Sequence, residues 1–174
     1  MLTSTDIGGV IERTAGAVAR RVSIGQGTAV TTATLSNNLC CRVTDGPWTL
    51  AVGMTEKYGG DGSGPNPGVF GRAALASCMA MSYAMWGSRL DVPLTAVTVE
   101  VQADYDVRGE LGVNETVRPG YLQVRAIVTI ESAAPESRVR RVVEIADRCG
   151  SWLDNFKNPV DVRCELRVTQ PAGA

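Results

Sequence analysis

The stretch GVFGRAALASCMAMSYAMWGSRL, residues 68–90, decides the fold of this chain. The loop before it, GGDGSGPNPG (59–68), ends in Asn66 and Pro67, which suit the N-cap and the first position of a helix. From there the pattern is helical and apolar on nearly every side, so the helix must be enclosed rather than laid on a surface. A chain of 174 residues cannot easily enclose such a helix alone. We therefore expect a partner subunit to cover it.

The sequence before this helix predicts one amphipathic helix and a small sheet. Residues 5–22 have apolar positions at helical spacing, with Thr5 or Asp6 as the cap. Alternating apolar residues and turn signals then predict three short strands, at about 27–35, 39–44 and 48–54.

After the central helix the pattern returns to strands. Clean alternation predicts strands over 97–107 and 122–130, separated by a polar loop over 108–120. A second helix opens at Pro135, and a last strand alternates over 162–168. The stripe that this second helix is expected to bury consists of Val139, Val142, Ala146 and Cys149. The order of elements predicts an α+β fold.

Composition excludes several classes of partner. A formal net charge of −1 gives no reason to expect binding to nucleic acid or to an anionic membrane. Aromatic residues make up only 5% of the chain, so platforms for stacking bases are not expected. The apolar run 69–86 has about the length of a bilayer span, but Arg72 and several small residues favour a buried helix.

The N-terminal sequence carries Asp6, Glu12 and Arg13 and lacks an uninterrupted apolar stretch, so it does not resemble a signal peptide. We therefore expect a cytoplasmic protein whose five cysteines are reduced. Cysteines in that compartment tend to be catalytic, sensory or core residues.

The chain contains no histidine, so the commonest general base is missing and a cysteine is the best nucleophile left. Cys78 lies in the middle of the central helix, beyond the reach of the helix dipole. Its small, apolar neighbours disfavour ionisation of the thiol, so a reactive Cys78 needs a cation or donor from elsewhere. The residues alone leave Cys78 as either a core residue or a nucleophile. The candidate cations are Arg42, Arg72 and Arg148.

Cys149 is the natural partner for Cys78, because it ends the buried stripe of its own helix. A thiol that reduces peroxide passes through a sulfenic acid and needs a second thiol within disulfide reach. Cys164 is expected to be a core residue, and the adjacent Cys40 and Cys41 point to opposite faces of a strand. Without a CxxC spacing or a histidine, a structural zinc site is not expected.

Three segments carry a family resemblance: GGDGSGPNPGVFGRAALASCMA (59–80), SRLDVPLTAVTVEVQADYD (88–106) and IADRCGSWLDNFKNPVDVRCEL (145–166). They resemble the OsmC/Ohr superfamily of osmotically inducible and organic-hydroperoxide-resistance proteins. The segment LGVNETVRPGY (111–121) is similar to that of a subgroup with an extra N-terminal helix. The resemblance implies one OsmC-like domain over 1–174, with a helical extension over 1–25. It also implies an intertwined homodimer in which antiparallel sheets wrap two central helices, with active sites at the interface.

The resemblance further implies a thiol-dependent peroxidase for oxidative-stress defence. Cys78 would attack an alkyl, aryl or fatty-acid hydroperoxide, and Cys149 would resolve the sulfenic acid as a disulfide. A dithiol reductant, either a lipoylated protein or a small thiol, would then restore both thiols. No metal, haem or other cofactor is implied.

The chain departs from the peroxidase pattern at two positions. Peroxidase members place a glutamate ten residues before the reactive cysteine, where this chain has Gly68. They also carry an arginine on the first hairpin, where this chain reads LSNNLC (35–40). Arg42 or Arg72 could replace that arginine, and Glu56 could supply a carboxylate. Two alternatives follow: a non-catalytic dimer of the same fold that binds a small apolar ligand, and a thiol redox sensor.

Overall fold

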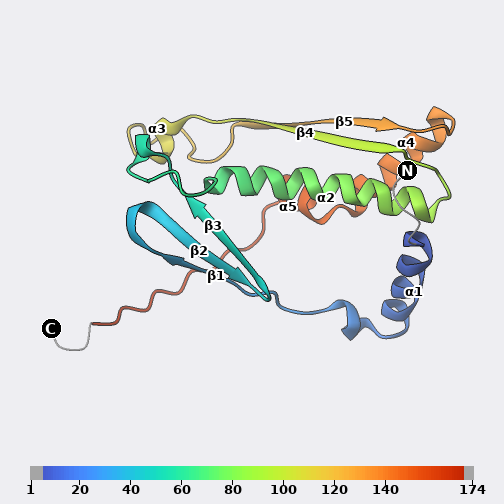
Figure 1. Cartoon of the computed structure of the whole chain (residues 1–174), viewed down its shortest axis with the longest axis horizontal. Coiled ribbons are helices and arrows are strands. Elements are labelled where there is room, and N and C mark those ends of the chain that lie inside the picture. The colour runs from blue at the N-terminus through green and yellow to red at the C-terminus, as the bar shows by residue number, and fades with distance from the viewer. Residues whose placement is uncertain (1–5, 171–174) are drawn as a thin grey trace.

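The computed structural model of this chain describes residues 6–170. It contains two antiparallel sheets (Figure 1). The first sheet has the order β1 (Thr31–Leu35), β2 (Cys40–Asp45) and β3 (Trp48–Gly53). The second sheet pairs β4 (Ala96–Asp104) with β5 (Gln123–Glu131), in a register that sets Val99 opposite Val128.

The remaining regular elements within residues 6–170 are helices. The α-helices are α1 (Ile7–Arg20), α2 (Pro67–Arg89), α3 (Val107–Glu110), α4 (Glu136–Cys149) and α5 (Ser151–Lys157). Short 3-10 helices cover Val22–Gly25, Asn37–Leu39 and Glu56–Tyr58. This order of helices and strands confirms the α+β class.

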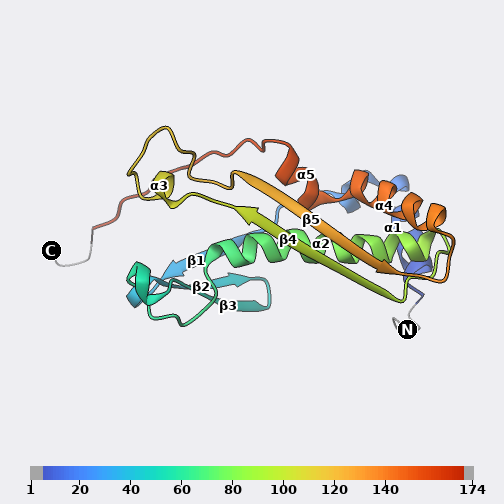
Figure 2. The ribbon, with the colours of Figure 1, turned by 90° about the horizontal axis from the view of Figure 1, so that it is seen from above.

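The central helix α2 begins where the sequence predicts. The Asn66 side chain accepts a hydrogen bond from the Val69 backbone N–H at 3.1 Å, and Pro67 stands at the first turn. The β4–β5 sheet covers one side of α2, while α4 and α5 pack along another (Figures 1 and 2). No helix within residues 6–170 combines the length and the hydropathy needed to cross a bilayer.

The core lies between α2, α4 and the β4–β5 sheet. Leu75, Met79, Tyr83 and Ala146 are buried there. Apolar residues at alternating positions of β4 and β5 pack against them, among them Val97, Val99, Val101, Val124 and Val128. The Tyr83 hydroxyl donates a hydrogen bond to Asp147 Oδ1 at 2.7 Å. Burial, together with this bond to a carboxylate, raises the pKa of Tyr83, so its hydroxyl remains a donor.

Replacing Tyr83 with phenylalanine is expected to destabilise the chain by about 1–3 kcal/mol, because the half-buried Asp147 carboxylate loses its donor. Chemical denaturation measures this loss. The matched control is Tyr105→Phe, since Tyr105 is 67% exposed and its replacement should change stability by less than about 0.5 kcal/mol. Equal stability of both variants would show that the Tyr83–Asp147 bond contributes nothing.

The N-terminal helix α1 packs against the C-terminal end of α2. Asp6 caps α1 by accepting from the Gly9 N–H at 2.8 Å, whereas Thr5, the other proposed cap, lies outside the described residues. The Gly8 N–H donates to Ser88 Oγ at 2.8 Å, and a Cβ at Gly8 would lie 2.9 Å from the Ser88 carbonyl oxygen. The glycine therefore permits the close approach of the two helices.

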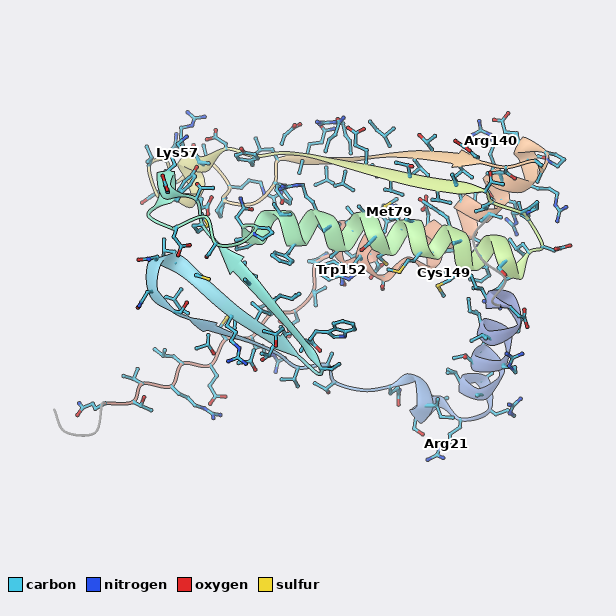
Figure 3. All side chains as sticks on the ribbon, in the orientation of Figure 1. Arg21, Lys57, Met79, Arg140, Cys149 and Trp152 are labelled. Atoms are coloured by element: carbon cyan, nitrogen blue, oxygen red, sulfur yellow. The ribbon has the colours of Figure 1, made fainter. Side chains whose placement is uncertain are left out.

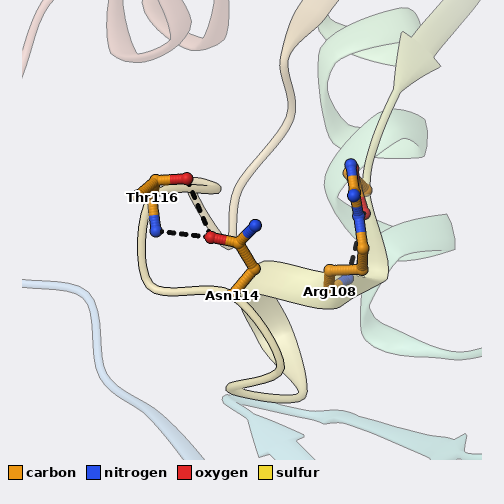
Figure 4. Close-up of polar contacts among 4 residues, drawn as sticks. Arg108, Asn114 and Thr116 are labelled. Carbon is orange, nitrogen blue, oxygen red and sulfur yellow. Dashed lines mark hydrogen bonds and ion pairs between the residues drawn. The ribbon is translucent and has the colours of Figure 1, made fainter.

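The single turn of α3 begins at Val107, the last residue of the strand predicted over 97–107, and runs into the polar loop predicted over 108–120. Asp106 pairs with Arg108 at 2.6 Å, and the hydrogen bonds from Arg108 lower the pKa of Asp106 to about 2. Asn114 Oδ1 accepts from both the backbone N–H and the hydroxyl of Thr116, at 2.9 and 2.8 Å (Figure 4). These local bonds give the loop its shape without a regular strand or helix.

The three-stranded sheet stands apart from the rest of the molecule. It makes no extensive contact with any helix or with the β4–β5 sheet in the described chain (Figure 1). Large apolar side chains on and beside it are exposed: Leu35, Leu39, Trp48 and Leu50. Exposed apolar surface of this kind is typical of an interaction site.

The predicted strand over 162–168 is wrong for the single chain. Residues 159–170 form no strand, and Val162, Leu166 and Val168 are each more than three-quarters exposed. Cys164, expected in the core, is exposed with them. A strand needs the hydrogen bonds of a neighbour, and neither described sheet pairs with this segment.

The sequence also misses α5 and misplaces Cys149. Helical periodicity predicts a buried Cys149, but α4 ends at this residue and the chain turns at Gly150. The Cys149 thiol is consequently exposed, whereas Val142 and Ala146 of the same stripe are buried.

Candidate thiol site

The structure brings the Cys78 thiol against the start of α5. The Cys78 sulfur lies 3.7 Å from Ser151 Oγ, within hydrogen-bond range for sulfur. Packing of α2 on α5 creates this contact between residues far apart in the sequence. Cys78 is partly buried, so it is neither sealed in the core nor fully open.

The same helix junction carries Cys149. It is the last residue of α4 and is separated from Ser151 only by Gly150. Consecutive Cα atoms are about 3.8 Å apart, so the Cα atoms of Cys149 and Ser151 lie within about 7.6 Å. In Figure 3, Met79 extends from α2 toward the β4–β5 sheet, whereas Cys149 lies on the other side of α2. Both thiols are free. The Cys78–Ser151 contact thus joins α2 to the helix junction that also carries Cys149.

Within the described chain, none of the charged residues proposed from the sequence forms a hydrogen bond with the Cys78 side chain. Arg42 is exposed on β2, in the sheet that stands apart, and Glu56 is exposed in its 3-10 helix. Arg148 is exposed beside Cys149. Among residues 6–170, the hydrogen-bond contact of the Cys78 side chain is with Ser151.

Arg72 points elsewhere. It precedes Cys78 by six residues, so the two side chains leave α2 about 120° apart. Arg72 Nη1 donates to the Tyr121 hydroxyl at 3.0 Å, and that hydroxyl donates to the Gly68 carbonyl oxygen at 3.1 Å. A Cβ at Gly68 would lie only 3.2 Å from Arg72 Nη1 and 3.3 Å from Tyr121 Oη. The Arg72–Tyr121 pair therefore fills the space beside the position where the resemblance expects a glutamate.

Ser151 is the site residue that sequence reasoning missed. The signal for it in the sequence is its position. Ser151 carries a hydroxyl two positions after Cys149 and directly after Gly150, a residue type that often ends a helix. A hydroxyl donor stabilises a thiolate, since hydrogen bonds to a charged form favour that form.

Replacing Ser151 with alanine is expected to slow alkylation of Cys78 at neutral pH by about three- to tenfold, because the thiolate loses a hydrogen-bond donor. Mass spectrometry of iodoacetamide-treated protein gives the rate at Cys78 alone. Ser77→Ala is the matched control, since the Ser77 hydroxyl bonds to the Ala73 carbonyl oxygen of its own helix. Identical rates in wild type and both variants would reject a role for Ser151.

Comparison with known proteins identifies the family to which this fold belongs. The family model described as OsmC-like protein matches residues 60–165, more than half of the chain. The chain therefore belongs to the OsmC-like protein family. Comparison with curated proteins gives no significant match.

Solved structures share the fold at low sequence identity. An OsmC-like protein from Mycoplasma pneumoniae aligns with a TM-score of 0.64 at 10% identity, covering 77% of this chain and 90% of that one. An organic hydroperoxide resistance protein from Legionella pneumophila gives 0.55 at 18% identity, with 79% and 94% covered. The organic hydroperoxide resistance protein OhrB of Bacillus subtilis gives 0.51 at 16% identity, with 81% and 98% covered. These likenesses establish the OsmC-like fold of the chain.

Proposed function

We propose that this chain is a thiol-dependent peroxidase that reduces organic hydroperoxides, with Cys78 as the attacking thiol and Cys149 as the resolving thiol. The observation that carries the proposal is the 3.7 Å contact between Cys78 and Ser151, which brings the Cys149 helix junction onto α2. Membership of a family that includes organic hydroperoxide resistance proteins supports the same chemistry. Detoxification of hydroperoxides would serve oxidative-stress defence.

The first step oxidises one thiol. The Cys78 thiolate attacks the terminal oxygen of the hydroperoxide, the O–O bond breaks, and the alkoxide takes a proton to leave as an alcohol. Cys78 becomes a sulfenic acid. The Ser151 hydroxyl, as a donor to Cys78, stabilises the thiolate before attack.

The second step closes and reopens a disulfide. The Cys149 thiol attacks the Cys78 sulfenic sulfur, an S–S bond forms, and water leaves. An external dithiol, either lipoyl-bearing or a small thiol, then exchanges with this disulfide and is itself oxidised. The exposure of Cys149 suits attack by such a reductant.

The functional unit of the proposal is a homodimer. Met81 and Met85, on the Cys78 side of α2, are 59% and 41% exposed in the single chain. The detached β1–β3 sheet and the unpaired segment 159–170 also present apolar side chains to solvent. A second copy that covers these surfaces would enclose α2, as its apolar pattern requires.

The proposed dimer would also supply a positive charge that stabilises the Cys78 thiolate. Arg42 and Glu56 lie on and beside the detached sheet, far along the chain from α5. If this sheet packs on the second copy, the two side chains can approach Cys78 of the partner subunit. Arg42 then stabilises the thiolate, and Glu56 holds the guanidinium in place.

The proposal is tested by the turnover of purified wild-type protein. With dihydrolipoamide or dithiothreitol as reductant, the protein is expected to consume cumene hydroperoxide well above the protein-free rate. Consumption that never exceeds the protein-free rate with either reductant would reject the peroxidase.

One observation favours the second candidate, a non-catalytic dimer that binds a small apolar ligand. Gly68 stands where peroxidase members carry a glutamate, and the Arg72–Tyr121 pair occupies the space beside it. This candidate predicts ligand binding without hydroperoxide turnover. A thiol sensor, in contrast, would oxidise once per chain and stop.

A further inference from the structure

A cavity of about 690 Å³ lies between α2, β5 and α5, within the usual range of about 300–1,000 Å³ for small-molecule pockets. Its walls are polar and apolar in about equal parts, and the apolar part includes Leu75, Met79, Val128 and Phe156. Cys78 is not among its lining residues. Leu75, Met79 and Tyr83 form a face of α2 that lies about 100° around the helix from Cys78. The cavity is therefore a feature separate from the thiol site.

Two cations line this cavity without a partner. Arg118 and Lys157 make no ion pair and donate no side-chain hydrogen bond within residues 6–170. By contrast Arg125 of β5, which does not line the cavity, is neutralised by Asp104 at 2.5 Å. Unpaired positive charge beside a cavity that has an apolar wall is available to an anionic group of a ligand.

The two ends of the cavity differ in charge. Arg118 precedes the start of β5, and Lys157 ends α5, so both belong to the end where Gln123 begins its strand. Val128 and Val143 line the cavity further along β5 and α4. Asp147 also lines it, but this carboxylate already accepts the Tyr83 hydroxyl and would repel a second anion. A carboxylate is thus favoured at the cationic end and disfavoured beside Asp147.

We infer that this cavity binds an amphipathic monocarboxylate, with the carboxylate at Arg118 and Lys157 and an unbranched acyl tail along α2. The eight-residue rise from Leu75 to Tyr83 gives the wall a length of about 12 Å, which suits a medium-chain tail. The inference goes beyond the proposed function, because the ligand carries no reactive group and the site excludes Cys78.

Decanoate is the probe, and the fluorescence of Trp152, which lines the cavity, reports binding. Wild-type protein is expected to bind decanoate at least tenfold more tightly than hexanoate, since each buried methylene strengthens binding by about fourfold. The Trp152→Phe variant should lose most of the fluorescence change, and calorimetry should still detect binding to it.

The double variant Arg118→Gln/Lys157→Gln isolates the charge. It is expected to bind decanoate about tenfold more weakly and to bind 1-decanol as wild type does. Both residues are exposed, so the fold should survive, and a thermal melt checks this. The matched control Arg140→Gln/Arg141→Gln removes the same charge from the outer face of α4 and should leave decanoate affinity unchanged.

Three results would overturn the inference: no binding of decanoate to wild type, undiminished affinity in the Arg118/Lys157 double variant, or equal weakening in the α4 control. The Cys78→Ser variant separates this site from the proposed peroxidase. It should bind decanoate with wild-type affinity, and loss of binding in this variant would contradict a site that excludes Cys78.

Discussion

Cys78→Ser is expected to lower hydroperoxide consumption by at least about 100-fold, to the protein-free rate. A serine hydroxyl is scarcely ionised at neutral pH and forms no sulfenic acid, so the first step has no nucleophile. The assay uses cumene hydroperoxide with dihydrolipoamide as reductant. Because Cys78 is only partly buried and serine is nearly isosteric, the variant should fold, which circular dichroism verifies.

Two further cysteine variants sharpen this test. Cys149→Ser should retain a single turnover and accumulate a sulfenic acid at Cys78, which dimedone traps for mass spectrometry. Cys164→Ser should keep the wild-type rate, since Cys164 is exposed in the segment 159–170, away from the Cys78–Ser151 contact. A Cys78→Ser variant that consumes hydroperoxide as fast as wild type would contradict the assigned nucleophile.

Met81→Glu/Met85→Glu is expected to weaken dimerisation by at least about 100-fold. Burial of a methionine side chain contributes about 1.5–3 kcal/mol, and each new carboxylate would also have to lose its hydration at the interface. Analytical ultracentrifugation measures the shift from dimer to monomer. Because both methionines lie on the Cys78 side of α2, the monomer should also lose activity if Arg42 and Glu56 act across the interface.

The control for this variant is Thr129→Glu/Ser137→Glu, which adds the same charge to exposed positions of β5 and α4. It should remain a dimer. A wild-type protein that sediments as a monomer at micromolar concentration, or a methionine variant that stays dimeric, would show that this face of α2 is not the interface.

The helix α2 and the strands β4 and β5 could be predicted because the residues that determine them are close together in the sequence. Asn66 and Pro67 define the start of α2 within one turn, and strict alternation defines β4 and β5. The segment 162–168 carries the same kind of alternation but forms no strand, because strand formation also needs a neighbouring edge. Within residues 6–170, neither sheet supplies that neighbour.

The site was predictable only in part, since its geometry is tertiary. The sequence singled out Cys78 and Cys149, but the Ser151 contact depends on how α5 packs on α2. Helix periodicity placed Cys149 on the buried stripe, whereas the turn at Gly150 exposes it. Arg72 matched the need for a cation, but its direction is set by Tyr121, a residue of another segment.

The central claim is that Cys78 and Cys149 of one chain form a redox pair, and non-reducing peptide mapping tests it most directly. Reduced protein receives one equivalent of cumene hydroperoxide, and its tryptic peptides are analysed by mass spectrometry without reductant. We expect a disulfide between the Cys78 and Cys149 peptides, with Cys40, Cys41 and Cys164 still alkylatable. Oxidised protein in which both thiols stay free, or in which Cys78 is joined to another cysteine, would contradict the account.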